Sequence, residues 1–206
     1  MSDEPKVMPA RFTDIQNGLV ELNDKLFPNS KRFDAKDIAF VREMNQLTTE
    51  KTMKLLKAPG YYSDDKEHVI FLAGGISSCP DWQKEVESHL KFAFEHKNFL
   101  VVNPRRDNFD MADKRATVQQ IEWEHKMLER CDTLLFWFPE ETLCPITLYE
   151  LGNYTDKKKN LIVGVHDRYK RRVDVEKQTQ LRRPDVKVAV GFDAFLAEVA
   201  KHLRTL

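Results

Sequence analysis

The sequence predicts an α/β fold built on a doubly wound parallel sheet that follows a helical extension. Two observations predict it. From about Phe71 onward, short runs rich in β-branched and aromatic residues alternate with longer segments of helical period. The middle runs are apolar on both faces, which is typical of strands buried between two helix layers. Right-handed crossovers then give a flavodoxin-like, or Rossmann-like, sheet with helices on both faces.

Five runs are expected to form the strands, at residues 68–73, 98–103, 133–138, 160–165 and 187–190. Apolar residues at helical spacing predict the helices between and after them. The expected buried stripes are Trp82, Val86, Leu90 and Ala93; Val118, Ile121, His125 and Leu128; Ile146, Tyr149 and Tyr154; and Phe195, Val199 and Leu203. Residues 173–183 carry fewer apolar side chains and predict a helix less strongly.

Residues 1–66 do not follow this alternation and are expected to form an N-terminal helical extension, with the α/β domain at 67–206. Residues 15–26 and 34–56 have the apolar spacing of amphipathic helices, and a turn-rich joint follows them. Such an arm packs on the core or on a second subunit, or else forms a separate binding module. The sequence leaves both possibilities open.

Composition narrows the classes of partner. The 33 basic and 33 acidic side chains cancel, so no global field favours a nucleic acid polymer or an anionic membrane, and a small molecule fits better. The three cysteines are widely spaced and odd in number, which suits a reducing compartment. A polar N-terminus and the lack of a long apolar run predict a cytoplasmic protein. No motif indicates a metal or a cofactor.

Ligands of such sheets bind beyond the carboxyl ends of the strands, so the following loops are the places to search. After the first strand come Gly74, Gly75, Ile76 and Ser77. Two adjacent glycines allow positive φ and close approach of a ligand to the backbone. A purely structural strand-to-helix turn explains the pair equally well. The segment lacks the downstream residues of a Walker loop or a GxGxxG fingerprint.

The loop after the second strand carries charge. Asn103 and Pro104 end that strand, and Arg105, Arg106 and Asp107 follow. The two guanidinium groups are placed to bind a phosphate or a carboxylate. Solvated arginines with nearby aspartates as internal partners are the structural alternative.

The third strand is followed by Cys144 and by a helix expected to start at Pro145, which puts Glu150 about one and a half turns into it. Near the positive end of a helix, this carboxylate is expected to be ionised and nucleophilic. The preceding helix supplies Glu124 and Trp123, the latter as a flat face for a base. Two carboxyls of this kind suit cleavage of a glycosidic bond. A solvated face for Glu124 and a core position for Trp123 are the alternatives.

Together these residues resemble the nucleoside 2-deoxyribosyltransferase superfamily, and more closely its nucleoside 2-deoxyribosyltransferase-like branch. The resemblance runs from about Val69 to Val165, through VIFLAGGIS, DWQKEV, NPRR, IEWEHKMLERCDTLLFW and TLYELG. It implies that Glu150 attacks C1′ of the sugar, expels the base and forms a glycosyl ester. A second base then makes the protein a transferase, and water makes it a hydrolase like the related deoxynucleoside 5′-monophosphate N-glycosidases. The family builds its sites between subunits, so the resemblance also implies a homodimer or larger homo-oligomer.

Three positions depart from the family pattern. Phe71 stands where the family commonly has a tyrosine, Cys144 where the transferases often have an aspartate, and Glu124 where a shorter aspartate is usual. The first two departures favour hydrolysis or binding over efficient base exchange. The arginine pair favours a phosphorylated ligand. A catalytically silent nucleotide-sensing module and an NAD glycohydrolase are the alternative functions.

Overall fold

The computed structural model describes residues 53–61, 67–94, 97–107, 109–110 and 112–206. Within these residues the strands are β1 (Lys54–Lys57), β2 (His68–Gly74), β3 (Phe99–Asn103), β4 (Thr133–Phe138), β5 (Asn160–Val165) and β6 (Ala189–Val190). The helices are α3 (Trp82–Phe94), α4 (Lys114–Arg130), α5 (Pro145–Tyr154), α6 (Arg172–Arg182) and α7 (Phe192–Leu203). Every strand pairing is parallel, in the order β1-β3-β2-β4-β5-β6. The α/β class and the doubly wound sheet are therefore confirmed.

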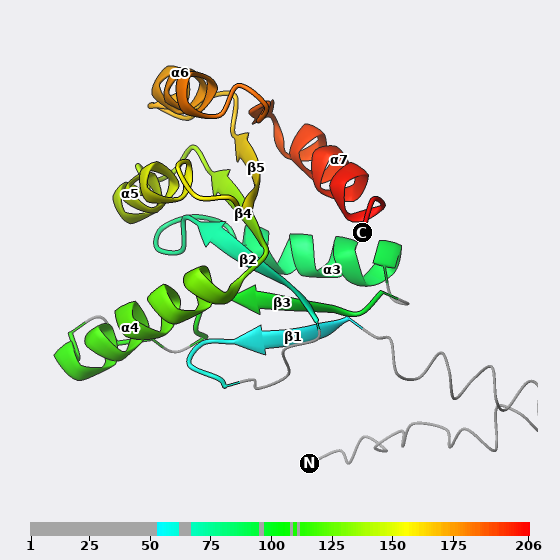
Figure 1. Ribbon diagram of the computed structural model, residues 1–206. Helices are drawn as coiled ribbons and strands as arrows, with labels where there is room; N and C mark the ends of the chain where they lie inside the picture. The colour runs from blue at the N-terminus through cyan, green and yellow to red at the C-terminus, as the bar shows by residue number, and fades with distance from the viewer. Residues whose placement is uncertain (1–52, 62–66, 95–96, 108, 111) are drawn as a thin grey trace, which may run out of the picture. The chain divides into compact units, whose positions relative to one another are not determined.

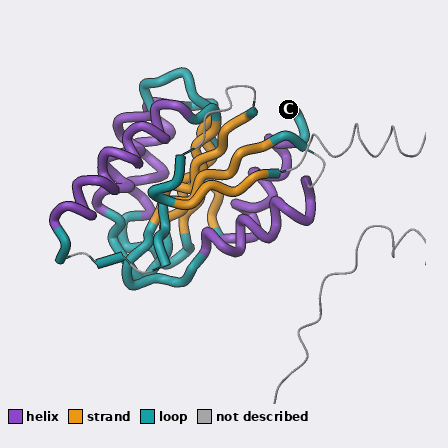
Figure 2. Tube along the Cα trace, turned by 90° about the horizontal axis from the view of Figure 1, so that it is seen from below, coloured by secondary structure: helices purple, strands orange, loops and turns teal. Residues whose placement is uncertain are grey.

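Helices cover both faces of the sheet. In Figure 1, α4, α5 and α6 lie on one side, and α3 and α7 on the other. Alternate residues of β2 separate the two cores: Phe71 packs with the first set of helices, whereas Ile70 and Leu72 pack with the second. Because both faces of β2 are covered, nearly all of its side chains are buried. Figure 2 shows the same sheet with helices on either side.

The sheet has one strand more than predicted. Residues 54–57 fall within the range expected for the helical extension, yet they form β1 and pair with β3 along its whole length. Leu56 is buried while Leu55 is 44% exposed, the alternation of an edge strand. A run this short has no clear period, which is why it reads as the tail of a helix. The rest of the expected extension lies outside the described residues.

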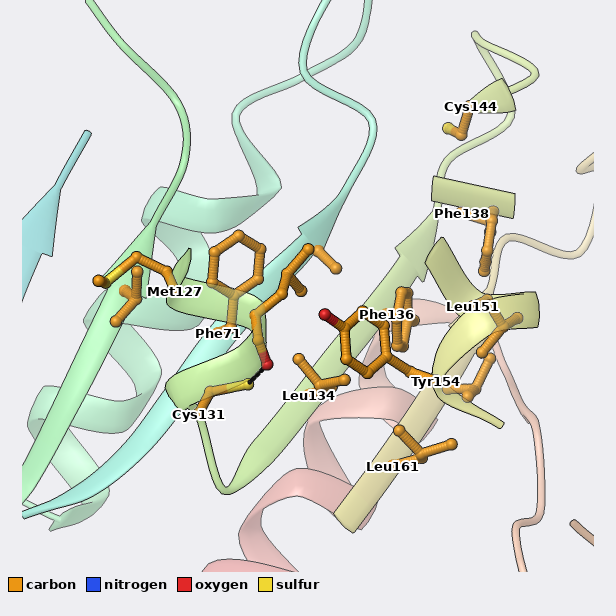
Figure 3. Packing of buried hydrophobic residues seen from close by; sticks show 14 of the residues in the cluster. Phe71, Met127, Cys131, Leu134, Phe136, Phe138, Cys144, Leu151, Tyr154 and Leu161 are labelled. Atoms are coloured by element: carbon orange, nitrogen blue, oxygen red, sulfur yellow. Dashed lines mark hydrogen bonds between the residues drawn. The ribbon is translucent and has the colours of Figure 1, made fainter. Parts of the chain in front are cut away.

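Two buried helix faces differ from the expected stripes. On α4 the buried residues are Gln120, Trp123, Met127 and Leu128, whereas Val118 and Ile121 are exposed. On α5 they are Thr147, Leu151 and Tyr154, and Tyr149 is 77% exposed. Figure 3 shows Tyr154 and Leu151 packed with Phe136 of β4. Each helix is thus rotated so that polar residues near its N-terminal half reach the carboxyl edge of the sheet.

Candidate active site

A hollow of about 370 Å³ lies at the carboxyl edge of the sheet, where the connections after β2, β3 and β4 meet. Nine of the thirteen predicted site residues line it. These are Phe71, Gly74, Gly75, Ile76, Ser77, Arg106, Glu124, Cys144 and Glu150. The hollow has the size of ordinary small-molecule sites.

Two carboxyl groups share the hollow. Glu150 comes from α5 and Glu124 from α4. Burial, with a further contribution from the charge of Glu124, raises the pKa of Glu150 to about 8. Burial also raises the pKa of Glu124, although a hydrogen bond from Gln120 opposes the rise. The expectation that Glu150 is ionised at neutral pH is therefore wrong for the ligand-free protein, because desolvation and a neighbouring carboxyl outweigh the helix end.

The glycine pair serves close packing between segments of the protein. A Cβ on Gly74 would lie 2.4 Å from Cζ2 of Trp82 and 2.5 Å from the carbonyl oxygen of Trp137. A Cβ on Gly75 would lie 2.8 Å from Cγ of Pro139 and 3.1 Å from Sγ of Cys144. Neither glycine has a positive φ, contrary to expectation. The bare backbone is what lets the loop after β2 pack closely against the loop after β4.

Arg105 lies outside the lining of the hollow and holds the loop after β2. Its Nη2 donates to the carbonyl oxygens of Pro80 at 3.1 Å and Gly75 at 3.5 Å. The Gly75 oxygen also accepts from Trp82 Nε1 at 2.8 Å and from Gln83 Nε2 at 3.2 Å. We call these three donors the Gly75 clamp. They fix the peptide that leads into Ile76 in the wall of the hollow.

Arg106 is the one cationic side chain among the described residues that line the hollow. Its guanidinium carbon lies 5.1 Å from the ring centre of Phe109. Its Nη1 is buried and has no hydrogen-bond partner within the described part of the chain. A buried guanidinium nitrogen without an acceptor is a ready donor for an anionic ligand.

The three remaining predicted residues make internal contacts outside the lining. Asn103 donates to Glu87 and accepts from the backbone of Arg105. Asp107 is exposed and lies 3.4 Å from Nζ of Lys57. Trp123 is buried in the core, where its Nε1 donates to the carbonyl oxygen of Gly60 at 2.6 Å.

Cys144 and Phe71 line the hollow as neutral groups. Cys144 caps α5 with a left-handed backbone, at φ 46°, and Pro145 occupies the first turn as expected. Burial raises the pKa of its thiol to about 12, so the group does not act as a thiolate at neutral pH. The Phe71 ring is almost fully buried. Figure 3 places Phe71 and Cys144 on β2 and on the loop that follows β4.

Sequence reasoning missed eight lining residues: Ala73, Pro104, Phe109, Gln120, Thr142, Pro145, Ile146 and Thr147. Spacing could have identified two of them. Gln120 precedes Glu124 by one helical turn, and Thr147 precedes Glu150 by three residues, so each shares a helix face with a predicted carboxyl.

The described residues contain no cluster of three or more histidine, cysteine, aspartate or glutamate side chains that could hold a metal ion. Nor does any described helix combine the length and the apolar character that crossing a membrane requires.

Comparison with known families gives one match. Residues 67–169 match the family model described as nucleoside 2-deoxyribosyltransferase like. A search of curated proteins finds no match. The matched segment begins just before β2 and ends after β5, and it includes every predicted residue of the hollow.

Proposed function

The chain belongs to the nucleoside 2-deoxyribosyltransferase-like family, and from this premise we propose that it cleaves the N-glycosidic bond of a deoxynucleoside or its 5′-monophosphate. The observation that carries the proposal is the pair Glu150 and Glu124, which lines one small-molecule hollow. We assign the attack to Glu150 and the handling of a proton to Glu124.

The first step forms an ester between Glu150 and the sugar and releases the base. A carboxylate oxygen of Glu150 forms a bond to C1′ while the bond from C1′ to the base nitrogen breaks. The electron pair of the broken bond goes to the base, which leaves with a proton. Because the pKa of Glu150 is about 8, the free protein at neutral pH holds a proton on this group, which must be lost before attack. Glu124 is the carboxyl placed to accept that proton at neutral pH and pass it to the base, and water supplies the proton to the base at a pH where both carboxyls are ionised.

Water as the final acceptor makes the protein a hydrolase, which we favour over base exchange. Phe71 has no hydroxyl to donate a hydrogen bond to the nucleophile, and Cys144 is a neutral thiol rather than a carboxylate. Both leave fewer polar groups to bind an incoming second base. Arg106 supports a phosphorylated substrate, because its buried Nη1 has no acceptor among the described residues and the side chain lines the hollow.

A silent nucleotide-binding module is the second candidate, and one observation favours it. A carboxyl that is mostly protonated at pH 7 is a poor nucleophile. In such a module the hollow would bind the nucleotide without breaking it.

For the assembly we propose a homodimer. Val118 and Ile121 on α4, and Ile146 and Tyr149 on α5, are large apolar side chains that remain exposed in the single chain. Several large apolar side chains left exposed on two helices are consistent with a subunit contact. Light scattering coupled to size-exclusion chromatography measures the assembly directly, and a strictly monomeric mass would contradict the proposal.

Release of free base tests the reaction. The full-length protein is incubated with deoxynucleosides, deoxynucleoside 5′-monophosphates and NAD, and products are separated by chromatography. Glu150→Ala should lower base release by about 10³-fold or more, because it removes the group assigned to attack C1′. The control is Glu122→Ala, which removes an exposed carboxyl from helix α4. Unchanged release in the Glu150 variant, with normal folding, would exclude the assigned role.

A further inference from the structure

Gln120 is a buried polar side chain in the wall of the hollow, and the reaction proposed above does not use it. It lies on α4 and is 8% exposed. Its Nε2 donates to the carbonyl oxygen of Pro104 at 2.8 Å and to Oε1 of Glu124 at 2.8 Å. Its Oε1 is buried and has no hydrogen-bond partner in the described part of the chain.

These contacts fix which end of the amide is available. A glutamine side chain carries two N–H donors and one acceptor oxygen. The Pro104 carbonyl can only accept, so the nitrogen must face it whatever the protonation state of Glu124. Rotating the amide would bring two oxygens together and leave both N–H groups without these acceptors. Both donors are therefore engaged, and only the acceptor oxygen remains to meet a ligand.

We propose that Oε1 of Gln120 accepts a hydrogen bond from the exocyclic amino group of the substrate's base, so that the site selects amino-bearing bases. The inference rests on the proposed function. Adenine and cytosine carry an amino group where hypoxanthine and uracil carry a carbonyl oxygen. An amide that offers only an acceptor pairs with the amino group and repels the carbonyl oxygen.

The position of Gln120 favours the base over the sugar. It is bonded to Glu124, the carboxyl assigned to the departing base, and Phe109 supplies an aromatic ring to the same hollow. A sugar hydroxyl both donates and accepts, so it would be served by either end of an amide. An amide that is fixed with only its oxygen available distinguishes groups that can donate a hydrogen bond from groups that can only accept one. The edges of the bases differ in this respect.

The test compares two pairs of substrates: the 5′-monophosphates of deoxyadenosine and deoxyinosine, and those of deoxycytidine and deoxyuridine. The ratio of kcat/KM within each pair is measured for the unaltered protein and for Gln120→Met. Gln119→Met, at an exposed neighbouring position on α4, is the matched control. Loosening Glu124 slows both members of a pair alike, so the ratio isolates recognition of the base.

We expect the amino member of the pair that fits the hollow to be preferred by about 10- to 100-fold in the unaltered and Gln119 proteins, and the ratio to fall toward one in Gln120→Met. A ratio near one in the unaltered protein, or an undiminished ratio in Gln120→Met, would overturn the inference. If Gln120→Met does not fold, as judged by the absence of a cooperative unfolding transition, Gln120→Leu takes its place. If neither variant folds, the kcat/KM ratio of the unaltered protein decides whether the inference holds.

A binding experiment separates this inference from the proposed reaction. Dissociation constants for the four nucleotides are measured by calorimetry on Glu150→Ala and on the Glu150→Ala, Gln120→Met double variant. A preference for amino bases that disappears in the double variant supports the inference even if no base is ever released. Base release without such a preference refutes the inference alone, and failure to bind any of the four refutes both.

Discussion

Glu124 acts on Glu150 across the hollow, and its charge adds to the effect of burial in raising the pKa of Glu150 to about 8. Two carboxyls that share a desolvated site cannot both ionise easily, so the group with the higher pKa retains the proton at neutral pH. Glu150 therefore carries a proton at neutral pH before any substrate arrives. Three of the five predictions below concern charges held in or near this arrangement.

The first prediction is a shifted pH profile. If only ionised Glu150 attacks, kcat/KM rises with pH and levels off above about 8. Glu124→Gln removes the negative neighbour, so the pKa of Glu150 falls and the rising limb moves to lower pH, while the maximal rate also falls. Glu122→Gln should leave the midpoint in place. If the rising limb of the pH profile stays in place or moves to higher pH in the Glu124 variant, the charge of Glu124 does not raise the pKa of Glu150.

The second prediction concerns stability. The pKa of Glu150 in the folded protein lies above its ordinary value of 4.5, so its contribution to stability is complete below pH 4.5 and is lost as the pH rises through 8. Glu150→Gln removes this loss. Denaturant unfolding should show a gain of up to about 5 kcal/mol for the variant at pH 9 relative to pH 5, from 1.36 kcal/mol per unit of pKa. An equal effect of the substitution at both pH values would contradict it.

The third prediction tests packing at the glycine pair. Gly74→Ala should lower the free energy of unfolding by about 1–3 kcal/mol, because the new Cβ would overlap Trp82 and the Trp137 carbonyl. Gly152→Ala is the control, since nothing lies within 4 Å of the Cβ that it adds on α5. That change should stabilise the helix by about 0.5–1 kcal/mol. Thermal unfolding of both variants measures the contrast.

The fourth prediction separates phosphate from sugar recognition. Arg106→Gln should raise KM for a deoxynucleoside 5′-monophosphate by about 10-fold or more, because a charged hydrogen bond is lost, and should change KM for the free nucleoside little. Arg115→Gln, on the exposed side of α4, should change neither. An equal rise for both substrates would assign Arg106 to the shape of the hollow instead.

The fifth prediction lies at the opposite, amino edge of the sheet. Oγ1 of Thr133 contacts Nε2 of His68 at 2.8 Å and Nε2 of His202 at 3.3 Å. Burial lowers the pKa of both histidines, so folding stability falls as the pH drops from their ordinary value of 6.5 toward the lower folded values. His202→Gln should reduce this loss of folding stability at acid pH. His125→Gln, an exposed histidine on α4, should retain the full loss in unfolding experiments at pH 7 and pH 5.

Strands buried on both faces were predictable because most of their residues are apolar. The segment TLLFWF of β4 is buried from Thr133 to Phe138, and the predicted bounds agree with the structure. Edge strands lack this signal: β1 has two lysines in four residues, and only its pairing with β3 makes it a strand. Long-range hydrogen bonding decides such a case, and a single sequence does not show it.

The hollow was located because loop position follows from topology, but its polar contacts were less accessible to sequence reasoning. The two arginines are adjacent in sequence and have different partners: Arg105 contacts the loop after β2, and Arg106 lines the hollow. A pattern of residue types does not distinguish them, since backbone geometry decides which guanidinium faces inward. The raised pKa of Glu150 likewise depends on a neighbour brought in from another helix.

Through the Gly75 clamp, α3 supports the hollow without lining it. Trp82 and Gln83 hold the Gly75 oxygen from a helix whose remaining length packs on the opposite face of the sheet. The loop after β2 is thus ordered by folding rather than by the arriving ligand, and association loses little conformational entropy there. Substitutions that repack α3, whose buried side chains lie in the core, are therefore expected to weaken ligand affinity as well as to lower the melting temperature.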